Sequence, residues 1–126
     1  MSAQDRRSYT RYQVDWRVRI GTSRKTVGVG RIRDVSLGGA LLESSLFFKD
    51  GERLQLEIFP LYRGKQRHMD ATVIIKHHRQ LKNTGYVFGV EFLFMPDHHR
   101  KLLLNVISVQ SGCQPIFDDS ELNLED

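Results

Sequence analysis

Cysteine, proline and long apolar runs are all scarce in this chain of 126 residues. The one cysteine, Cys113, cannot form a disulfide within the chain or build a cysteine-based zinc site, which agrees with a reducing compartment. No apolar run approaches the roughly 20 residues of a membrane helix, and no apolar segment of a secretory signal follows the charged start, MSAQDRRSYTR. We therefore expect a cytoplasmic protein with no membrane insertion.

The composition is that of one globular domain. Only 3 residues are proline, 40% are hydrophobic and 27% are charged, which excludes a disordered, collagen-like or membrane-spanning chain. The length suits a single domain with its own core and is too short for two average domains.

The net charge of +4 conceals a strong asymmetry along the chain. Residues 1–33 carry nine basic and two acidic side chains, a net charge of +7, and eight of the nine are arginines. Residues 34–112 carry a net charge of +2, and residues 113–126 carry five acids and no base. Because the planar guanidinium group suits phosphates and guanine edges, the basic end predicts an anionic partner, with phosphate favoured.

Apolar and polar residues alternate with period 2 through most of the chain, which predicts β-strands with one buried and one wet face. The clearest case is residues 14–20, where Trp16 falls on the apolar side and is expected in the core. Glycine-rich and polar turns separate the segments. The predicted strands are residues 14–20, 26–35, 40–43, 54–58, 69–75 and 86–92.

After Pro96 the apolar period changes to that of an amphipathic helix, with Leu102, Leu103, Val106 and Ile107 on one face. Gly112 can end this helix. Six short strands followed by one helix predict a mainly β fold, a small six-stranded antiparallel barrel with one C-terminal α-helix. We divide the chain into a flexible basic arm (1–13), the barrel with its helix (14–112) and a mobile acidic tail (113–126).

No phosphate-binding loop, nucleophile elbow or zinc-protease helix occurs, so the sequence does not predict an enzyme. Two other motifs stand out instead. RRxxxR occupies residues 6–11, and DxSxxG occupies residues 34–39, ahead of Gly89-Val90-Glu91-Phe92. In this order, over about residues 5–110, the sequence resembles a PilZ domain.

PilZ domains are bacterial receptors for the second messenger cyclic di-GMP, built as a six-stranded antiparallel barrel with a C-terminal helix. The resemblance implies cyclic di-GMP as the ligand and no cofactor or metal. It places ligand contacts on both motifs and implies a role in motility or biofilm regulation. The implied ligand-binding residues are Arg6, Arg7, Arg11, Asp34, Ser36, Gly38 and Gly39.

The chemistry of these residue types agrees with the implied ligand. Arginine forks match phosphates and the O6 and N7 acceptors of guanine, and ionised Asp34 accepts from the N–H groups of a guanine edge. On an extended strand Asp34 and Ser36 would project to the same side. Gly39 would allow a close approach of the backbone to the ligand or a positive φ at the turn.

The mechanism that we expect is a ligand-driven switch. The arm is mobile without ligand because its like charges repel and it has few apolar residues. Cyclic di-GMP orders the arm against the barrel and changes the surface presented to a downstream protein partner, with a ligand-dependent change of oligomeric state as one form of output.

Alternatives remain open at this point, both for the function of the chain and for the role of its acidic tail. In place of a cyclic di-GMP receptor, the chain would be a PilZ-like interaction module that binds no nucleotide, or a basic barrel that binds single-stranded nucleic acid through arginine and aromatic contacts. The acidic tail either only solubilises the chain or shields the arm until a ligand displaces it. The pairs His77-His78 and His98-His99 lack ligand spacing and are interpreted as solvated side chains.

Overall fold

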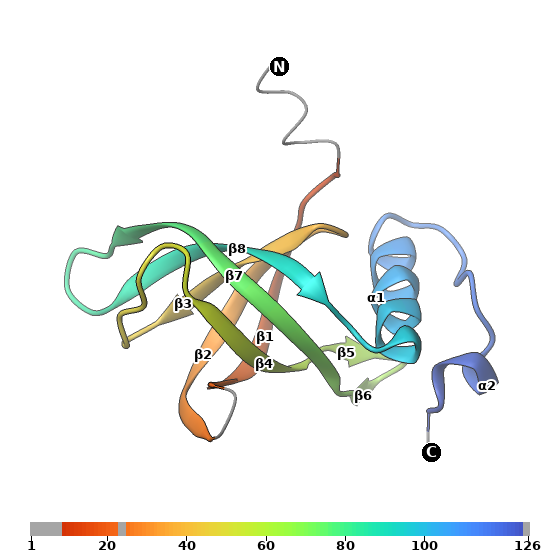
Figure 1. Cartoon of the computed structure of the whole chain (residues 1–126). Helices are drawn as coiled ribbons and strands as arrows, with labels where there is room; N and C mark the ends of the chain where they lie inside the picture. The colour runs from red at the N-terminus through yellow and green to blue at the C-terminus, as the bar shows by residue number, and fades with distance from the viewer. Residues whose placement is uncertain (1–8, 23–24, 125–126) are drawn as a thin grey trace, which may run out of the picture.

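The computed structural model describes residues 9–22 and 25–124. Figure 1 shows a β-barrel with a helix beside one end. In chain order the elements are β1 (Tyr12–Gly21), β2 (Thr26–Val35), β3 (Gly39–Ser44), β4 (Arg53–Phe59), β5 (Leu61–Tyr62), β6 (Lys65–Gln66), β7 (Met69–Gln80), β8 (Tyr86–Phe94), α1 (Asp97–Gln110) and α2 (Asp119–Leu122).

Six of the strands close into one barrel in the order β1-β2-β3-β8-β7-β4, and neighbouring strands are antiparallel. This confirms the predicted six-stranded barrel and helix. Strand β1 begins at Tyr12, so the barrel begins two residues before the predicted boundary at residue 14. Strand β7 continues past the predicted end to Gln80. Its last residues are exposed, so that no alternation marks them in the sequence.

A short hairpin of β5 and β6 was not predicted. Each of its strands has two residues, too few for a period-2 pattern. The turn between them is formed by Arg63 and Gly64, both with positive φ, 55° and 75°. Two such residues are typical of a tight hairpin turn, so Arg-Gly was the one local signal.

The alternating residues form the core as predicted. In β1 the buried positions are Trp16, Val18 and Ile20, and the residues between them are exposed. Phe88 of β8 is fully buried in the same cluster. Full burial of one such side chain stabilises the fold by about 1.5–3 kcal/mol, so this repeated pattern is what closes the barrel.

Helix α1 follows Pro96 and ends before Gly112, whose φ is 87°. Three of its four predicted apolar positions are buried, and Ile107 is half-buried against the core. The helix contacts β7 and α2. No helix within residues 9–22 and 25–124 is long and apolar enough to span a membrane.

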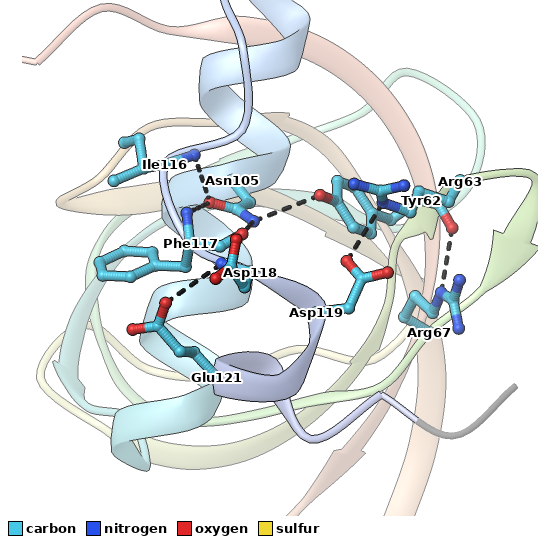
Figure 2. Close-up of polar contacts among 9 residues, drawn as sticks. All are labelled: Tyr62, Arg63, Arg67, Asn105, Ile116, Phe117, Asp118, Asp119 and Glu121. Atoms are coloured by element: carbon cyan, nitrogen blue, oxygen red, sulfur yellow. Dashed lines mark hydrogen bonds and ion pairs between the residues drawn. The ribbon is translucent and has the colours of Figure 1, made fainter.

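The C-terminal segment differs from the mobile tail that the sequence predicts. Figure 2 shows residues 116–118 lying against α1 around the side chain of Asn105. The amide oxygen of Asn105 accepts from the backbone N–H groups of Ile116 and Phe117, both at 2.9 Å. Its amide nitrogen donates to the Phe117 carbonyl at 2.9 Å and to the Tyr62 hydroxyl at 3.2 Å.

The segment then forms α2, whose Leu122 is only 2% exposed. Ion pairs join Arg63 to Asp119 at 3.3 Å and Lys101 to Glu121 at 4.0 Å (Figure 2 draws the first). These contacts come from residues distant in sequence, which is why the acid-rich segment looked unstructured by itself. Its described part, up to residue 124, packs on the domain instead of extending from it.

Candidate functional site

The DxSxxG segment lies where β2 passes into β3. Asp34 pairs with Leu41 of β3, directly after an irregularity in the pairing at Ile32. Strand β2 ends at Val35, so Ser36 is the first residue of the turn. The Asp34 side chain is half-buried at this edge, at 22% exposure.

Ser36 organises the turn from inside. Its hydroxyl accepts hydrogen bonds from the backbone N–H groups of Gly38 and Gly39, both at 3.2 Å. The backbone N–H of Ser36 donates to the Gly39 carbonyl at 2.8 Å. The residue is 5% exposed. The prediction that Asp34 and Ser36 project together from one strand is therefore wrong, because the chain leaves the strand between them.

Gly39 is required by the barrel itself. It pairs with Glu91 of β8, and a Cβ at Gly39 would lie 2.2 Å from the Val90 carbonyl oxygen. The predicted positive φ at Gly39 is wrong, since the residue lies in extended β3. The close approach that the structure shows at Gly39 is to the neighbouring strand β8, and an approach to the ligand stays a prediction. The Gly38 carbonyl in turn accepts from Phe92 N–H at 2.9 Å, which attaches the turn to β8.

The two sequence motifs meet through Arg11 and Asp34. An Arg11 guanidinium nitrogen donates to the Asp34 carboxylate at 2.7 Å, across 23 positions of sequence. The Arg11 side chain is 53% exposed, so this pair is accessible from solvent. Arg6 and Arg7 lie outside the described residues. The structure thus brings together Arg11, Asp34 and the Ser36–Gly39 turn.

Tyr9, inside the RRxxxR segment, is a neighbour of this site. A Cβ at Gly38 would lie 2.9 Å from the Tyr9 ring, which therefore covers the turn at this point. Tyr9 is still half exposed to solvent. Both Tyr9 and the Phe92 amide were missed as parts of the site, because their proximity to the turn depends on tertiary structure.

Carboxylates neutralise several other arginines of the basic end. Asp15 pairs with Arg31 at 3.4 Å and with Arg33 at 3.1 Å, and Arg33 also donates to Glu43 at 2.7 Å. The hydrogen bond to Glu43, reinforced by its charge, raises the pKa of Arg33 above its usual value. The net charge of +7 is thus not all available to a partner.

A cleft in the described part of the chain is lined by other residues. It has a volume of about 550 Å³ and lies between β1, β5 and α1. Its walls include Val14, Trp16, Leu61 and Val106 and do not include residues 34–39. The Arg11–Asp34 pair is instead a surface site, of the kind that a charged ligand can reach without entering an apolar cavity.

The histidine pairs were expected to be solvated, and this is wrong for His99. His99 is 9% exposed, and its Nδ1 accepts from the Asp70 backbone N–H at 2.9 Å. His78 contacts the Asp50 carboxylate at 2.7 Å. Burial is the largest effect on the pKa of His99 and lowers it. The nearby His98 and His68 lower this pKa further, whereas the charge of Asp70 raises it.

The lowered pKa of His99 predicts a loss of stability in mild acid. Folded His99 binds its proton more weakly than unfolded histidine, whose pKa is 6.5. The stabilisation is therefore complete above pH 6.5 and falls as the pH drops below that value. His99→Asn keeps an acceptor for the Asp70 N–H but removes the titrating imidazole. Between about pH 7.5 and about pH 5.5 its free energy of unfolding, measured in urea, should fall less than that of the parent. Equal losses in both proteins would contradict this assignment.

The closed antiparallel barrel with one C-terminal helix is the PilZ type of barrel that the two motifs imply. The family model described as PilZ domain matches residues 5–108. The chain therefore belongs to the PilZ domain family.

Solved structures show the same fold. The inhibitor of motility MotI/DgrA of Bacillus subtilis aligns with a TM-score of 0.71 and 21% identity over 85% of this chain and 52% of that one. YcgR of Escherichia coli in complex with c-di-GMP aligns with a TM-score of 0.64 and 20% identity, over 85% of this chain and 46% of YcgR. The isolated PilZ domain of YcgR with c-di-GMP gives a TM-score of 0.61 and 20% identity over 85% and 92%.

This chain spans about half the length of the first two of these proteins. A comparison with curated protein sequences finds no match. At these identities the likeness extends to the fold.

Proposed function

We propose that this protein is a receptor for cyclic di-GMP. The observation that carries the proposal is the contact between Arg11 of RRxxxR and Asp34 of DxSxxG at 2.7 Å, in a chain of the PilZ domain family. Support comes from YcgR of Escherichia coli, whose PilZ domain was solved with c-di-GMP. In this proposal the chain works by binding and not by catalysis.

The ligand has two anionic phosphates and two guanines, and the site offers a complementary group for each. Asp34 accepts from the N1–H and N2–H₂ groups of a guanine edge, and Arg11 turns its fork to a phosphate or to O6 and N7. Ligand binding thereby exchanges the Arg11–Asp34 ion pair for two contacts with ligand. Because the Arg11 side of this pair is exposed to solvent, opening the pair costs little, about 1 kcal/mol.

The remaining residues of the two motifs have different tasks in this proposal. Arg6 and Arg7 add further guanidinium groups against the phosphates and guanines. Ser36 stabilises the turn, since its hydroxyl accepts hydrogen bonds from the backbone N–H groups of Gly38 and Gly39. Gly38 and Gly39 shape the turn, since Gly38 leaves room for the Tyr9 ring and Gly39 for the backbone of β8.

The output of binding follows from the charge of residues 1–11. Cyclic di-GMP supplies the counter-charge that draws the arginines to the barrel, and the ordered arm presents a new surface to a downstream protein. The required free energy is the difference in ligand affinity between the ordered and disordered states of the arm. MotI/DgrA of Bacillus subtilis is an inhibitor of motility by its name, and a role of this chain in motility or biofilm formation is proposed on the same basis.

The test is isothermal titration of cyclic di-GMP into the parent and into Arg7→Ala, Arg11→Ala and Asp34→Ala variants at physiological salt. Each variant removes a charged hydrogen-bonding group, worth about 1–3 kcal/mol for a bidentate contact, so the affinity should fall about fivefold to 150-fold. Arg17→Ala is the matched control, because Arg17 is an exposed arginine of β1 outside both motifs. Its binding should equal that of the parent.

Competition separates this function from its alternatives. GTP and single-stranded DNA in excess should leave cyclic di-GMP binding in place, whereas a nonspecific polyanion site would be blocked and would weaken steeply with salt. A folded parent that gives neither heat nor a thermal shift with cyclic di-GMP would refute the receptor and leave a nucleotide-independent interaction module.

A further inference from the structure

A second group of functional side chains lies outside the Arg11–Asp34 site. His68 directly precedes β7, Asp70 lies in β7, and His99 lies in the first turn of α1. One ligand atom from each of these three residues lies within 4.8 Å of the others. Glu57 of β4 joins them from the neighbouring strand, where it is the direct partner of Asp70.

The distances centre on one ring nitrogen of His68. Its Nε2 lies 3.0 Å from the Glu57 carboxylate and 3.0 Å from the Asp70 carboxylate. A ring nitrogen carries at most one proton, so His68 cannot make a full hydrogen bond to both acceptors. A cation with bonds of about 2 Å holds its tetrahedral ligand atoms about 3.3 Å apart, close to the distance from His68 Nε2 to each of the two carboxylates.

Charge and donor type select the class of cation. Two carboxylates face the cluster, and Arg19, 3.3 Å from Glu57, offsets one of them, which leaves a net attraction for a dication. One imidazole nitrogen with two carboxylate oxygens suits Zn²⁺ and similar transition metals, whereas Ca²⁺ and Mg²⁺ prefer oxygen ligands alone.

His99 forms the inner wall of the cluster. Its Nδ1 accepts a hydrogen bond from the Asp70 backbone N–H, so the imidazole positions the backbone of one proposed ligand residue. The His99 ring also packs edge-on against the His68 ring, with centroids 5.3 Å apart. The open side faces solvent, since His68 and Glu57 are both partly exposed. Three protein ligands with a water in the remaining position is a common arrangement at zinc.

We propose that Glu57, His68 and Asp70 form a binding site for a transition-metal dication such as Zn²⁺. The ion joins β4 to the start of β7 beside the first turn of α1, and so braces the barrel at the end where the helix packs. The proposal does not depend on cyclic di-GMP, because none of these residues belongs to the two motifs.

The experiment is titration of Zn²⁺ into the tag-free full chain, followed by calorimetry, and of Co²⁺, followed by its visible absorption. We expect one equivalent to bind, with Zn²⁺ displacing Co²⁺, and a higher melting temperature with Zn²⁺. His68→Ala and Asp70→Asn should each weaken binding at least about tenfold, which is the usual effect of losing one contact of about 1.4 kcal/mol.

His78→Ala is the matched control. His78 also contacts a carboxylate, that of Asp50 at 2.7 Å. In the described part of the chain His78 has this one carboxylate contact, whereas His68 has two. This variant should bind Zn²⁺ like the parent. Since His68 is 42% exposed, its variant should fold, and circular dichroism checks this. Absence of saturable Zn²⁺ binding, unchanged binding in folded His68→Ala, or an equal loss in His78→Ala would each overturn the proposal.

Discussion

Asn105→Ala should lower the free energy of unfolding by about 3 kcal/mol, because it leaves buried hydrogen-bonding groups without partners. Asn105 is 0% exposed, and its side chain takes part in four hydrogen bonds, to Tyr62, Ile116 and Phe117 (Figure 2). Alanine cannot replace any of them. Residues 113–124 should then leave α1, and the apolar contact made by Leu122 should be lost with them.

Urea unfolding followed by the fluorescence of Trp16, the one tryptophan, measures the stability change. Hydrogen exchange at the Ile116 and Phe117 amides reports on the segment directly. Gln110→Ala is the control, since Gln110 is an exposed residue of the same helix with one long contact, 3.5 Å, to the Gln13 carbonyl. Unchanged protection of both amides in Asn105→Ala would show that other contacts hold the segment.

Gly39→Ala should destabilise the barrel by a similar amount, about 3 kcal/mol, and should abolish cyclic di-GMP binding. The added Cβ would lie 2.2 Å from the Val90 carbonyl oxygen, which is backbone and cannot move without separating β3 from β8. The same shift disturbs the Ser36 turn, because Gly39 exchanges hydrogen bonds with Ser36. Stability and binding are thus coupled through one residue.

Thermal or urea unfolding and isothermal titration measure the two effects separately. Gly51→Ala is an informative comparison, because Gly51 has a φ of 89° and a Cβ added there would meet no atom within 4 Å beyond its chain neighbours. It should lose only the backbone preference of glycine, about 1 kcal/mol, and keep full ligand affinity. If Gly39→Ala were as stable as Gly51→Ala, the close strand contact would not be what requires glycine.

Most of the fold could be predicted because alternation is a local property with a direct physical cause. In β1 every second residue from Trp16 to Ile20 is apolar, and burying that face requires a sheet. The β5–β6 hairpin could not be predicted in this way, since two-residue strands contain no period. The packing of residues 113–124 was mispredicted because it depends on Asn105, a single polar residue in a helix with no local signal of its partners.

The candidate site was predictable in part. The spacing of RRxxxR and DxSxxG selected Arg11 and Asp34, and the structure brings these two into contact. It does not support the expected orientation of Ser36, whose hydroxyl bonds within the turn. The roles of Arg6 and Arg7, the mobility of the arm and the cytoplasmic location stay predictions.

The sequence by itself determined the class of fold and the family, because alternating polarity and two spaced motifs are readable without knowing any contact. Tertiary structure alone decided which groups meet. Arg11 reaches Asp34 only because β1 pairs with β2, and Glu57 faces Asp70 only because β4 pairs with β7. The physical reason is that side-chain chemistry is local to each residue, whereas proximity across tens of positions is set by strand register and barrel closure.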